Sequence, residues 1–325
     1  MTEIFYSLIS KALGIPARQV EKTMGLLDEG ATIPFISRYR KEVTGGLDEV
    51  QIGDINDHYG KLKDVSKRKE TILTSIEEQG KLTPELKKRI ETSWDSTELE
   101  DIYLPYKPKR QTKAEIARKK GLEPLATLLM LQTAQDSTKA ASPYVKGEVK
   151  DVREALQGAR DIIAEWVNED EQARNTVRNS FSRTAVISSK VVKGKEEEGS
   201  KYRDYFDFSE PLNRCSSHRL LALRRGEAEG FLRVSISPDA EGCIERLNRR
   251  FVKGRSDTSA QVEEAVGDSF KRLLKPSIET EFANLSKMKA DEEAIRVFSE
   301  NLRQLLLSPP LGQKRVLGVE PGYRT

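Results

Sequence analysis

The sequence predicts a mainly α-helical protein, in which a multi-helix N-terminal domain with helix-turn-helix-like elements precedes a second helical region with a few short strands. Charged residues make up 33% of the chain and aromatic residues only 6%, and the frequent Ala, Leu, Glu, Lys and Arg are good helix formers. Apolar residues recur at three- and four-residue spacing, as on the buried face of a helix. Before the C-terminal residues, two stretches have strand character, 185–192 and 231–237, and the second alternates apolar and polar residues.

Two short helices joined by a tight turn are predicted at the N-terminus. Gly14 ends the first helix, and Pro16 opens a second that stops at Gly30. The pair resembles the start of a helix-turn-helix, and plain packing of two helices is the alternative. Their buried faces are predicted from apolar residues at helical spacing, which are Ile4, Phe5, Leu8, Ile9 and Leu13, then Val20, Met24 and Leu27.

A first cluster of bases lies in the stretch ATIPFISRYRKEVTGGLDEVQI, residues 31–52. The side chains expected to pack are Ile33, Phe35, Ile36 and Tyr39, and the bases that alternate with them are Arg38, Arg40 and Lys41. These bases could contact phosphate groups. The alternative is that they clamp neighbouring helices through buried pairs with carboxylates.

One long helix is predicted from its N-cap, Asp48, to about Gln79, with Gly80 as its stop. Its apolar stripe runs through Ile52, Ile55, Tyr59, Leu62, Val65, Ile72 and Ile76. A shorter helix is predicted over 83–94, with proline in its first turn.

The charge of the chain changes sign abruptly in the stretch that follows. Residues 91–101 hold five acids and no base, whereas 107–120 holds seven bases and one acid. Because proline disfavours helix, Pro105 predicts an extended, stiff connection between the two runs, and this connection carries Tyr103 and Tyr106.

This stretch supplies the second cluster of candidate bases. Thr112 reads as the N-cap of a short helix that Gly121 ends. The basic side chains could bind a polyanion, while the two tyrosine rings stack on nucleobases. Alternatively, the cations pair with nearby acids and the tyrosines are packed anchors. The cluster comprises Lys107, Lys109, Arg110, Arg118, Lys119 and Lys120.

The residue pattern changes near residue 186 from helical spacing to a strand-like stretch, which predicts the main domain boundary. Residues 1–186 are then a helical domain and 187–307 a second helical region with short strands. Helices are predicted at about 124–134, 151–167, 169–183 and 216–225, then after Asp239, and at 258–274, 276–289 and 291–307, with Pro276 separating two of them. The helix after Asp239 brings a third cluster of bases, Arg246, Arg249 and Arg250, followed by Lys253 and Arg255.

The last residues predict a linker at 308–312 and a buried strand at 316–319. A lone strand has nothing to pair with, so residues 308–325 are interpreted as a linker and the first strand of a further domain. An edge strand docked on the preceding domain is the alternative.

Catalytic and metal-binding patterns find little support in the sequence. A Walker-type glycine loop, an HExxH motif and a nucleophile elbow are all absent. Cys215 and Cys243 lack zinc-site spacing and fit a reducing compartment, and His58 and His218 are expected to be structural. Apolar runs fall short of the roughly 20 residues of a membrane span, and no export signal is present. We therefore expect a cytoplasmic protein with no catalytic residue, no metal, no cofactor and no membrane partner.

Four stretches together resemble the bacterial Tex family of transcription accessory proteins across nearly the whole chain. They are residues 31–52, LEDIYLPYKPKRQTKAEIARKKGLEPLA at 99–126, HRLLALRRGEAEG at 218–230 and LSPPLGQKRVLGVEPGYRT at 307–325. The resemblance implies a helical N-terminal region with a helix-turn-helix, and the entry into a YqgF-type, RNase H-like domain. It also implies helix-hairpin-helix and OB-fold RNA-binding modules that this chain does not carry.

Glu320 matches the first carboxylate of such an RNase H-like domain, where the family usually has Asp. One carboxylate cannot build a two-metal nuclease site. The expected function is thus a non-enzymatic, nucleic-acid-associated transcription accessory protein that contacts the phosphate backbone of RNA and/or DNA, weakly for this chain alone. The alternative is a helical scaffold for protein–protein or interdomain docking, and the transcription machinery is a candidate partner. The oligomeric state is left open.

Overall fold

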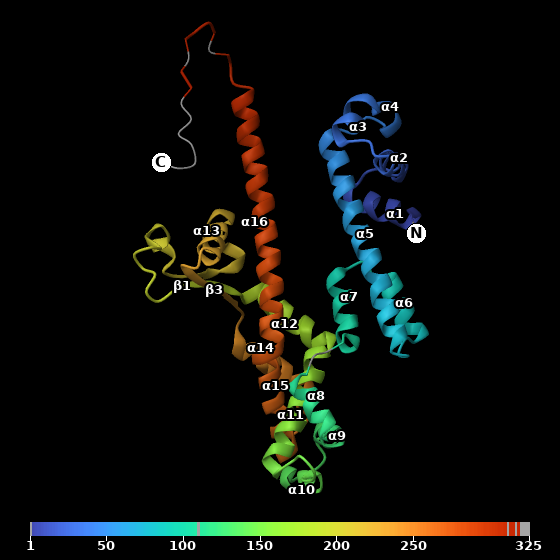
Figure 1. Cartoon of the computed structure of the whole chain (residues 1–325), viewed down its shortest axis with the longest axis vertical. Coiled ribbons are helices and arrows are strands. Elements are labelled where there is room, and N and C mark those ends of the chain that lie inside the picture. The colour runs from blue at the N-terminus through green and yellow to red at the C-terminus, as the bar shows by residue number, and fades with distance from the viewer. Residues whose placement is uncertain (1, 109–110, 311, 316, 319–325) are drawn as a thin grey trace. The chain divides into compact units, whose positions relative to one another are not determined.

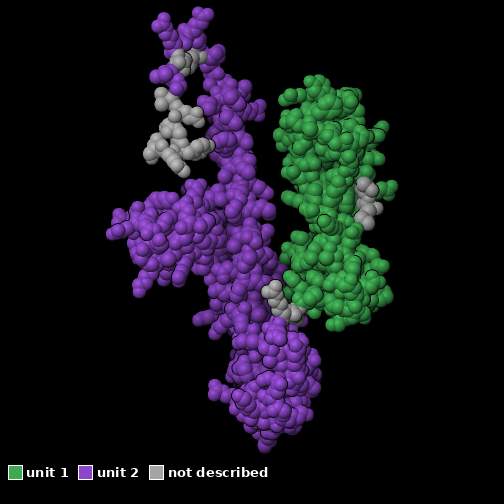
Figure 2. Space-filling model, viewed as in Figure 1, with its two compact units in different colours: residues 1–110 green, residues 111–325 purple. Residues whose placement is uncertain are grey.

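The computed structural model describes residues 2–108, 111–310, 312–315, 317 and 318, and it is mainly helical with one small sheet, as predicted. The chain forms two compact units, Met1–Arg110 and Gln111–Thr325, which Figure 2 shows in different colours. Each unit has hydrophobic clusters of its own. The predicted boundary near residue 186 falls inside the second unit.

The first unit is built along one long helix, α5 (Glu49–Glu78), which runs through the unit from end to end (Figure 1). Its first half packs against α1, α2 and α3, and its second half packs against α6 and α7. The predicted stripe is buried at Ile52, Ile55, Tyr59, Ile72 and Ile76. The other helices are α1 (Thr2–Leu13), α2 (Ala17–Asp28), α3 (Ile33–Tyr39), α4 (Lys41–Thr44), α6 (Pro84–Thr92) and α7 (Ser96–Tyr103).

A capping box fixes where α5 begins, as the sequence predicts for Asp48. The backbone N–H of Gln51 donates to Asp48 Oδ1 at 2.8 Å, and the Asp48 N–H donates to Gln51 Oε1 at 3.1 Å. Two of the free N–H groups at the helix start are thereby satisfied. Gly45 and Gly46, at φ +73° and +86°, turn the chain from α4 into this cap.

The second unit is organised around α11 (Val152–Glu169). This helix packs against α8, α9 and α15 and buries Ala155, Ala159, Ile162, Ile163 and Val167 completely. The other helices are α8 (Lys113–Lys119), α9 (Glu123–Leu131), α10 (Ser137–Ala141), α12 (Glu171–Thr184), α13 (Ser217–Ala228), α14 (Ala240–Phe251), α15 (Asp257–Ser269) and α16 (Lys275–Leu306). No helix was predicted at the position of α10.

A three-stranded antiparallel sheet adjoins these helices, with strand order β2-β1-β3. The strands are β1 (Val186–Val191), β2 (Asp207–Pro211) and β3 (Leu232–Ser237). Ser188 of β1 faces Ser209 of β2 on one side and Ser235 of β3 on the other. The helices α13 and α16 contact β3, and Ile187 and Ile236 join the same core as α11 and α12. β1 and β3 match the predicted strands, whereas β2 was not predicted.

Pro276 lies in the first turn of α16, close to where the sequence analysis separates two helices, but the expected break between 289 and 291 is wrong. A π-helical turn, Phe270–Leu274, joins α15 to α16, and α16 then continues without a break to Leu306. Pro105 likewise lies at the start of a 3-10 helix, Leu104–Tyr106, so this connection is helical and not extended.

Some predictions lie beyond what the structure describes. Lys109, Arg110 and Glu320 lie outside the described residues, as do two of the four residues of the predicted strand at 316–319. The assignment of 308–325 to a further domain stays a prediction. None of the helices among the described residues combines the length and apolar composition needed to cross a membrane.

Close packing of α11 gives a test of this fold. A Cβ placed on Gly158 would lie 2.4 Å from Leu122 Cδ1 and 3.3 Å from Ala117 Cβ, whereas a Cβ on Gly267 in α15 would meet nothing within 4 Å. We expect Gly158→Ala to lower the free energy of unfolding by about 1 kcal/mol through overpacking. Gly267→Ala should raise it by about 0.5–1 kcal/mol, because alanine has the higher helix propensity.

Urea denaturation measures both effects. Trp166 in α11 reports on the second unit, and a Trp94→Phe background removes the fluorescence of the first unit. Equal effects of the two substitutions would contradict the close approach of α11 to α8 and α9.

Candidate nucleic-acid interface

The first cluster of bases lies on two very short helices. Thr32 caps α3, and its Oγ1 accepts from the N–H of Phe35 at 3.4 Å. Seven residues make less than two full turns, so α3 has room for only one buried face. That face is occupied by Ile36 and Ser37. At Arg40 the backbone leaves the helical region, with φ −132° and ψ 26°, and α4 starts at the next residue.

An aromatic and cationic surface results, which we call the α3–α4 patch: Phe35, Arg38, Tyr39, Arg40 and Lys41. Phe35 is 40% exposed and Tyr39 64% exposed, with ring centroids 5.5 Å apart. The guanidinium carbon of Arg40 lies 5.1 Å from the centroid of the Phe35 ring. All three bases are exposed, and they form no ion pair within the part of the chain that the structure describes. The alternative of buried carboxylate pairs is therefore wrong for this cluster.

Phe35 and Tyr39 are the residues whose exposure the sequence analysis missed. Both were expected to pack, because they are aromatic and lie among apolar neighbours. Their spacing could have indicated that the two rings share one environment, because residues four apart lie on the same side of a helix. Exposed rings next to free cations can stack on bases while the cations contact phosphates.

The two tyrosines of the second cluster pack against an apolar cluster of the first unit, Tyr103 fully and Tyr106 in part. Tyr103 is only 6% exposed, its hydroxyl lies 3.0 Å from Ser75 Oγ, and the guanidinium of Arg68 lies 5.3 Å from its ring centroid. Tyr106 is half-buried against the same cluster of apolar side chains. The burial of Tyr103 fits the alternative of a packed anchor, whereas stacking by the half-buried Tyr106 stays a prediction. Lys107, next to them, is exposed.

Two of the four bases on or beside α8 turn inward. Arg118 Nη1 lies 2.7 Å from Oε1 of Glu165, whose side chain is 8% exposed, and Lys120 Nζ lies 2.6 Å from Glu154 Oε1. Burial works to lower the pKa of Arg118, but the hydrogen bond and charge of Glu165 outweigh it and raise that pKa. The hydrogen bond to Glu154 likewise raises the pKa of Lys120. Arg118 and Lys120 are thus structural, and Lys119 alone of the predicted bases on α8 is freely exposed.

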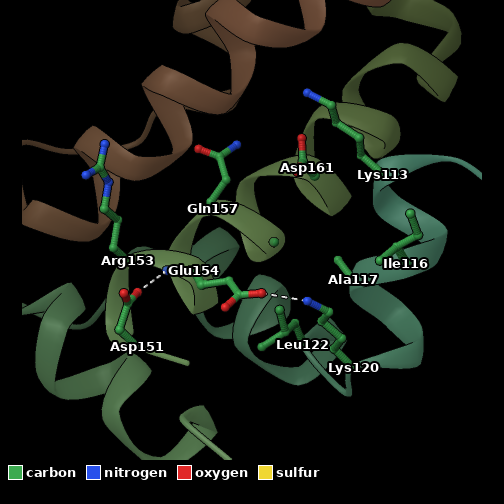
Figure 3. Close-up of a pocket in the computed structure, with 11 residues that line it drawn as sticks. Lys113, Ile116, Ala117, Lys120, Leu122, Asp151, Arg153, Glu154, Gln157 and Asp161 are labelled. Atoms are coloured by element: carbon green, nitrogen blue, oxygen red, sulfur yellow. Dashed lines mark hydrogen bonds and ion pairs between the residues drawn. The ribbon is translucent and has the colours of Figure 1, made fainter. Parts of the chain in front are cut away.

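A recess of about 470 Å³ lies between α8 and α11 (Figure 3). Its rim carries charges of both signs, and Figure 3 shows the pair between Lys120 and Glu154 within it. Burial raises the pKa of Asp161, against the opposing charge of Arg272. Since its bases, Lys113, Lys120 and Arg153, are matched by Asp151, Glu154 and Asp161, this recess has no preference for a polyanion.

The arginines of the third cluster are held by polar neighbours. Arg246 Nη1 donates to Ser180 Oγ at 2.5 Å, and Arg250 Nη2 lies 2.9 Å from Asp170 Oδ2. Arg249 pairs with Glu245, one turn earlier, at 2.5 Å. That last pair is solvated on both sides, with side chains 73% and 64% exposed, and such pairs contribute little to stability. All three arginines are exposed, and two of them, Arg246 and Arg250, also bridge α14 to α12.

Two protein-family models match this chain. Residues 3–77 match the Tex-like protein N-terminal domain, and residues 132–298, half of the chain, match the Tex central region. The chain belongs to the Tex family.

Relatives in this family share sequence along nearly the whole chain. The chain is 42% identical over 322 residues to a Bacillus subtilis protein, uncharacterized protein YdcI, covering 98% of this chain and 45% of the relative. It is 42% identical to the transcriptional accessory protein Tex of Neisseria gonorrhoeae, over 98% of this chain and 43% of that one. A human S1 RNA-binding domain-containing protein is 31% identical over 92% of this chain and 32% of its own length. The chain thus spans less than half the length of each of these relatives.

The pairing of Arg118 can be tested against its neighbour. Arg118→Ala leaves the carboxylate of Glu165 buried without its guanidinium partner, so we expect the free energy of unfolding to fall by about 2–4 kcal/mol. Lys119→Ala, the matched control, removes one exposed charge and should change it by less than about 0.5 kcal/mol. The measurement is urea denaturation of the chain, followed by Trp166 fluorescence. If Arg118→Ala proves as harmless as Lys119→Ala, Arg118 is free to serve a ligand.

Proposed function

We propose that this chain is a non-enzymatic, nucleic-acid-associated part of a Tex-type transcription accessory protein, and that the α3–α4 patch is its contact surface. The single observation that carries the proposal is that three bases, Arg38, Arg40 and Lys41, are exposed and unpaired beside two exposed aromatic rings. The names of two relatives, a transcriptional accessory protein and an S1 RNA-binding domain-containing protein, support a nucleic-acid-associated role. A cytoplasmic location and the transcription machinery as a partner belong to the same proposal.

The patch contacts the phosphate backbone and reads little sequence. Arginine and lysine bind phosphate oxygens whatever the base, so these contacts position a strand without specifying it. Phe35 and Tyr39 add stacking on unpaired bases, which tolerates any sequence because every base has a π-face. The net charge of the chain is only +3, so the attraction is local to the patch. The helix-turn-helix role of α1 and α2 stays a prediction.

Binding across a salt series tests the patch. We expect the combined variant Arg38→Ala, Arg40→Ala, Lys41→Ala to bind single-stranded RNA more weakly. The slope of log K against log salt concentration should flatten by about 0.7 for each lost phosphate contact, or about 2 in all. Fluorescence anisotropy with a labelled oligonucleotide measures the slope.

The control variant removes the same charge elsewhere in the same unit. Lys81, Lys87 and Lys88 are exposed lysines on or next to α6, which packs on the opposite half of α5 from the patch. Their combined change to alanine should leave most of the slope in place. If the slope falls equally in both variants, RNA is attracted by charges spread over the surface, and the α3–α4 patch is not a specific binding site.

A second candidate function is docking of further protein segments on α16. The stripe of α5 that first suggested a scaffold is buried within its own unit, so it cannot dock a partner. The C-terminal half of α16 is different: α13 lies beside it as far as Asn301, and its last turns continue beyond α13 and the sheet (Figure 1). Its exposed apolar side chains are Ile295, Val297, Phe298, Leu302, Leu305 and Leu306. The occupant that fits is the part of the longer relatives that lies outside their match to this chain.

Association with that part tests the second candidate. We expect Phe298→Ser with Leu302→Ser to abolish binding of this chain to the unmatched part of the Bacillus subtilis relative, expressed separately, in analytical ultracentrifugation. Val50→Ser is the control, because Val50 is 70% exposed but lies in the other unit. Binding that survives the α16 variant would exclude this face as the docking surface.

A further inference from the structure

A second recess, on the second unit, is lined only by neutral polar and basic side chains. It has a volume of about 220 Å³ and lies between α12 and α14. Five of its lining residues come from α12 at a spacing of three, one, three and one, which places them on one face of that helix. They are Thr176, Asn179, Ser180, Arg183 and Thr184, and Arg246 of α14 completes the lining.

The two arginines reach this recess from different helices. Arg246 is oriented by its hydrogen bond to Ser180, whose hydroxyl is itself part of the lining. Arg183 is exposed and forms no ion pair or side-chain hydrogen bond with the described residues. A base in the last turn of α12 also suits the helix dipole, but this reason does not apply to Arg246 in the middle of α14.

No acid within the described residues lines the recess. Asp239, the N-cap of α14, is engaged at the start of the helix, where its Oδ1 accepts from the N–H of Gly242 at 3.1 Å, and Glu241 in the first turn does not line the recess. Glu245, one residue before Arg246, pairs with Arg249. The positive charge in the recess is therefore not cancelled by the helix that supplies half of it.

The hydrogen-bonding groups of the lining also favour an acceptor-rich ligand. The hydroxyls of Thr176 and Thr184 donate to the carbonyl oxygens of Gln172 and Ser180, at 2.7 and 2.9 Å. The side-chain amide of Asn179 has no hydrogen bond to any described residue, so its N–H groups remain available together with those of Arg183.

We infer that this recess binds a phosphate group, held between Arg183 and Arg246 with Asn179 as an additional donor. A tetrahedral phosphate presents only acceptors, and a pair of guanidinium groups matches it in charge and geometry. If each of the five heavy atoms of a phosphate is given the roughly 30 Å³ of a liquid water molecule, the group needs at most about 150 Å³. The recess, at about 220 Å³, is large enough to hold it. Two sources share this chemistry: a phosphodiester of a nucleic-acid strand and the phosphate of a small molecule.

The first arm of the test uses inorganic phosphate and the complete chain. We expect ³¹P NMR line broadening to show binding, and Arg183→Ala to weaken it about tenfold, the loss of one charged hydrogen bond. Arg249→Ala is the matched control, because it removes the same charge from the helix of Arg246 but lies outside the recess. Circular dichroism confirms that each variant is folded, and Arg183 has no described partner whose loss would unfold it.

The second arm separates the two sources with a single-stranded RNA oligonucleotide. If Arg183→Ala weakens RNA binding and Arg249→Ala does not, the recess holds a backbone phosphate. If only inorganic phosphate is affected, it holds the phosphate of a small molecule. Equal behaviour of wild type, Arg183→Ala and Arg249→Ala with both probes overturns the inference. The α3–α4 variants should leave the inorganic phosphate signal unchanged, so failure of the proposed function and failure of this inference are distinguishable.

Discussion

A buried carboxylate must be paired, and this constraint decides which bases of the second unit remain for a ligand. The central helix α11 carries two carboxylates toward the interior, Asp161 and Glu165, with side chains 11% and 8% exposed. Taking such charges out of water costs several kcal/mol unless cations and hydrogen bonds replace the water. Arg118 meets Glu165, and Arg272 reaches Asp161 at 3.2 Å. These pairs tie α8 and the π-helical turn to α11, and they withdraw two arginines from the surface.

In the first unit, by contrast, the bases of the α3–α4 patch are not paired with buried carboxylates. Its core forms on α5, and the short helices α3 and α4 contribute few buried side chains to it. No buried acid lies there to capture Arg38 or Arg40, and the two rings that cannot reach the core stay in solvent beside them. The patch is therefore a consequence of helices too short to bury both of their faces.

Helix positions were predictable because helical periodicity, caps and proline act over a few residues. The N-cap at Asp48, the stop at Gly80 and the strands at 186–191 and 232–237 were all recognisable from neighbouring residues. One error came from treating Pro105 as a helix breaker, although it occupies the first turn of the 3-10 helix Leu104–Tyr106. Strand β2 was missed because five residues, DFSEP, are too few to show alternation, and pairing with β1 defines them.

By itself, the sequence determined the helical class, the extent of α5, the absence of familiar catalytic motifs and the resemblance to the Tex family, since all of these are carried by local spacing and local motifs. Only the tertiary structure decided which bases are free. Arg118 and Lys119 are adjacent in the chain and equally charged, yet one is paired with a carboxylate 47 residues away and the other is in water. The same holds for Tyr103, packed near Ser75, and Tyr39, exposed beside Phe35. The physical reason is that the free energy of a charge or a ring depends on what the fold places next to it, and those neighbours are remote in sequence.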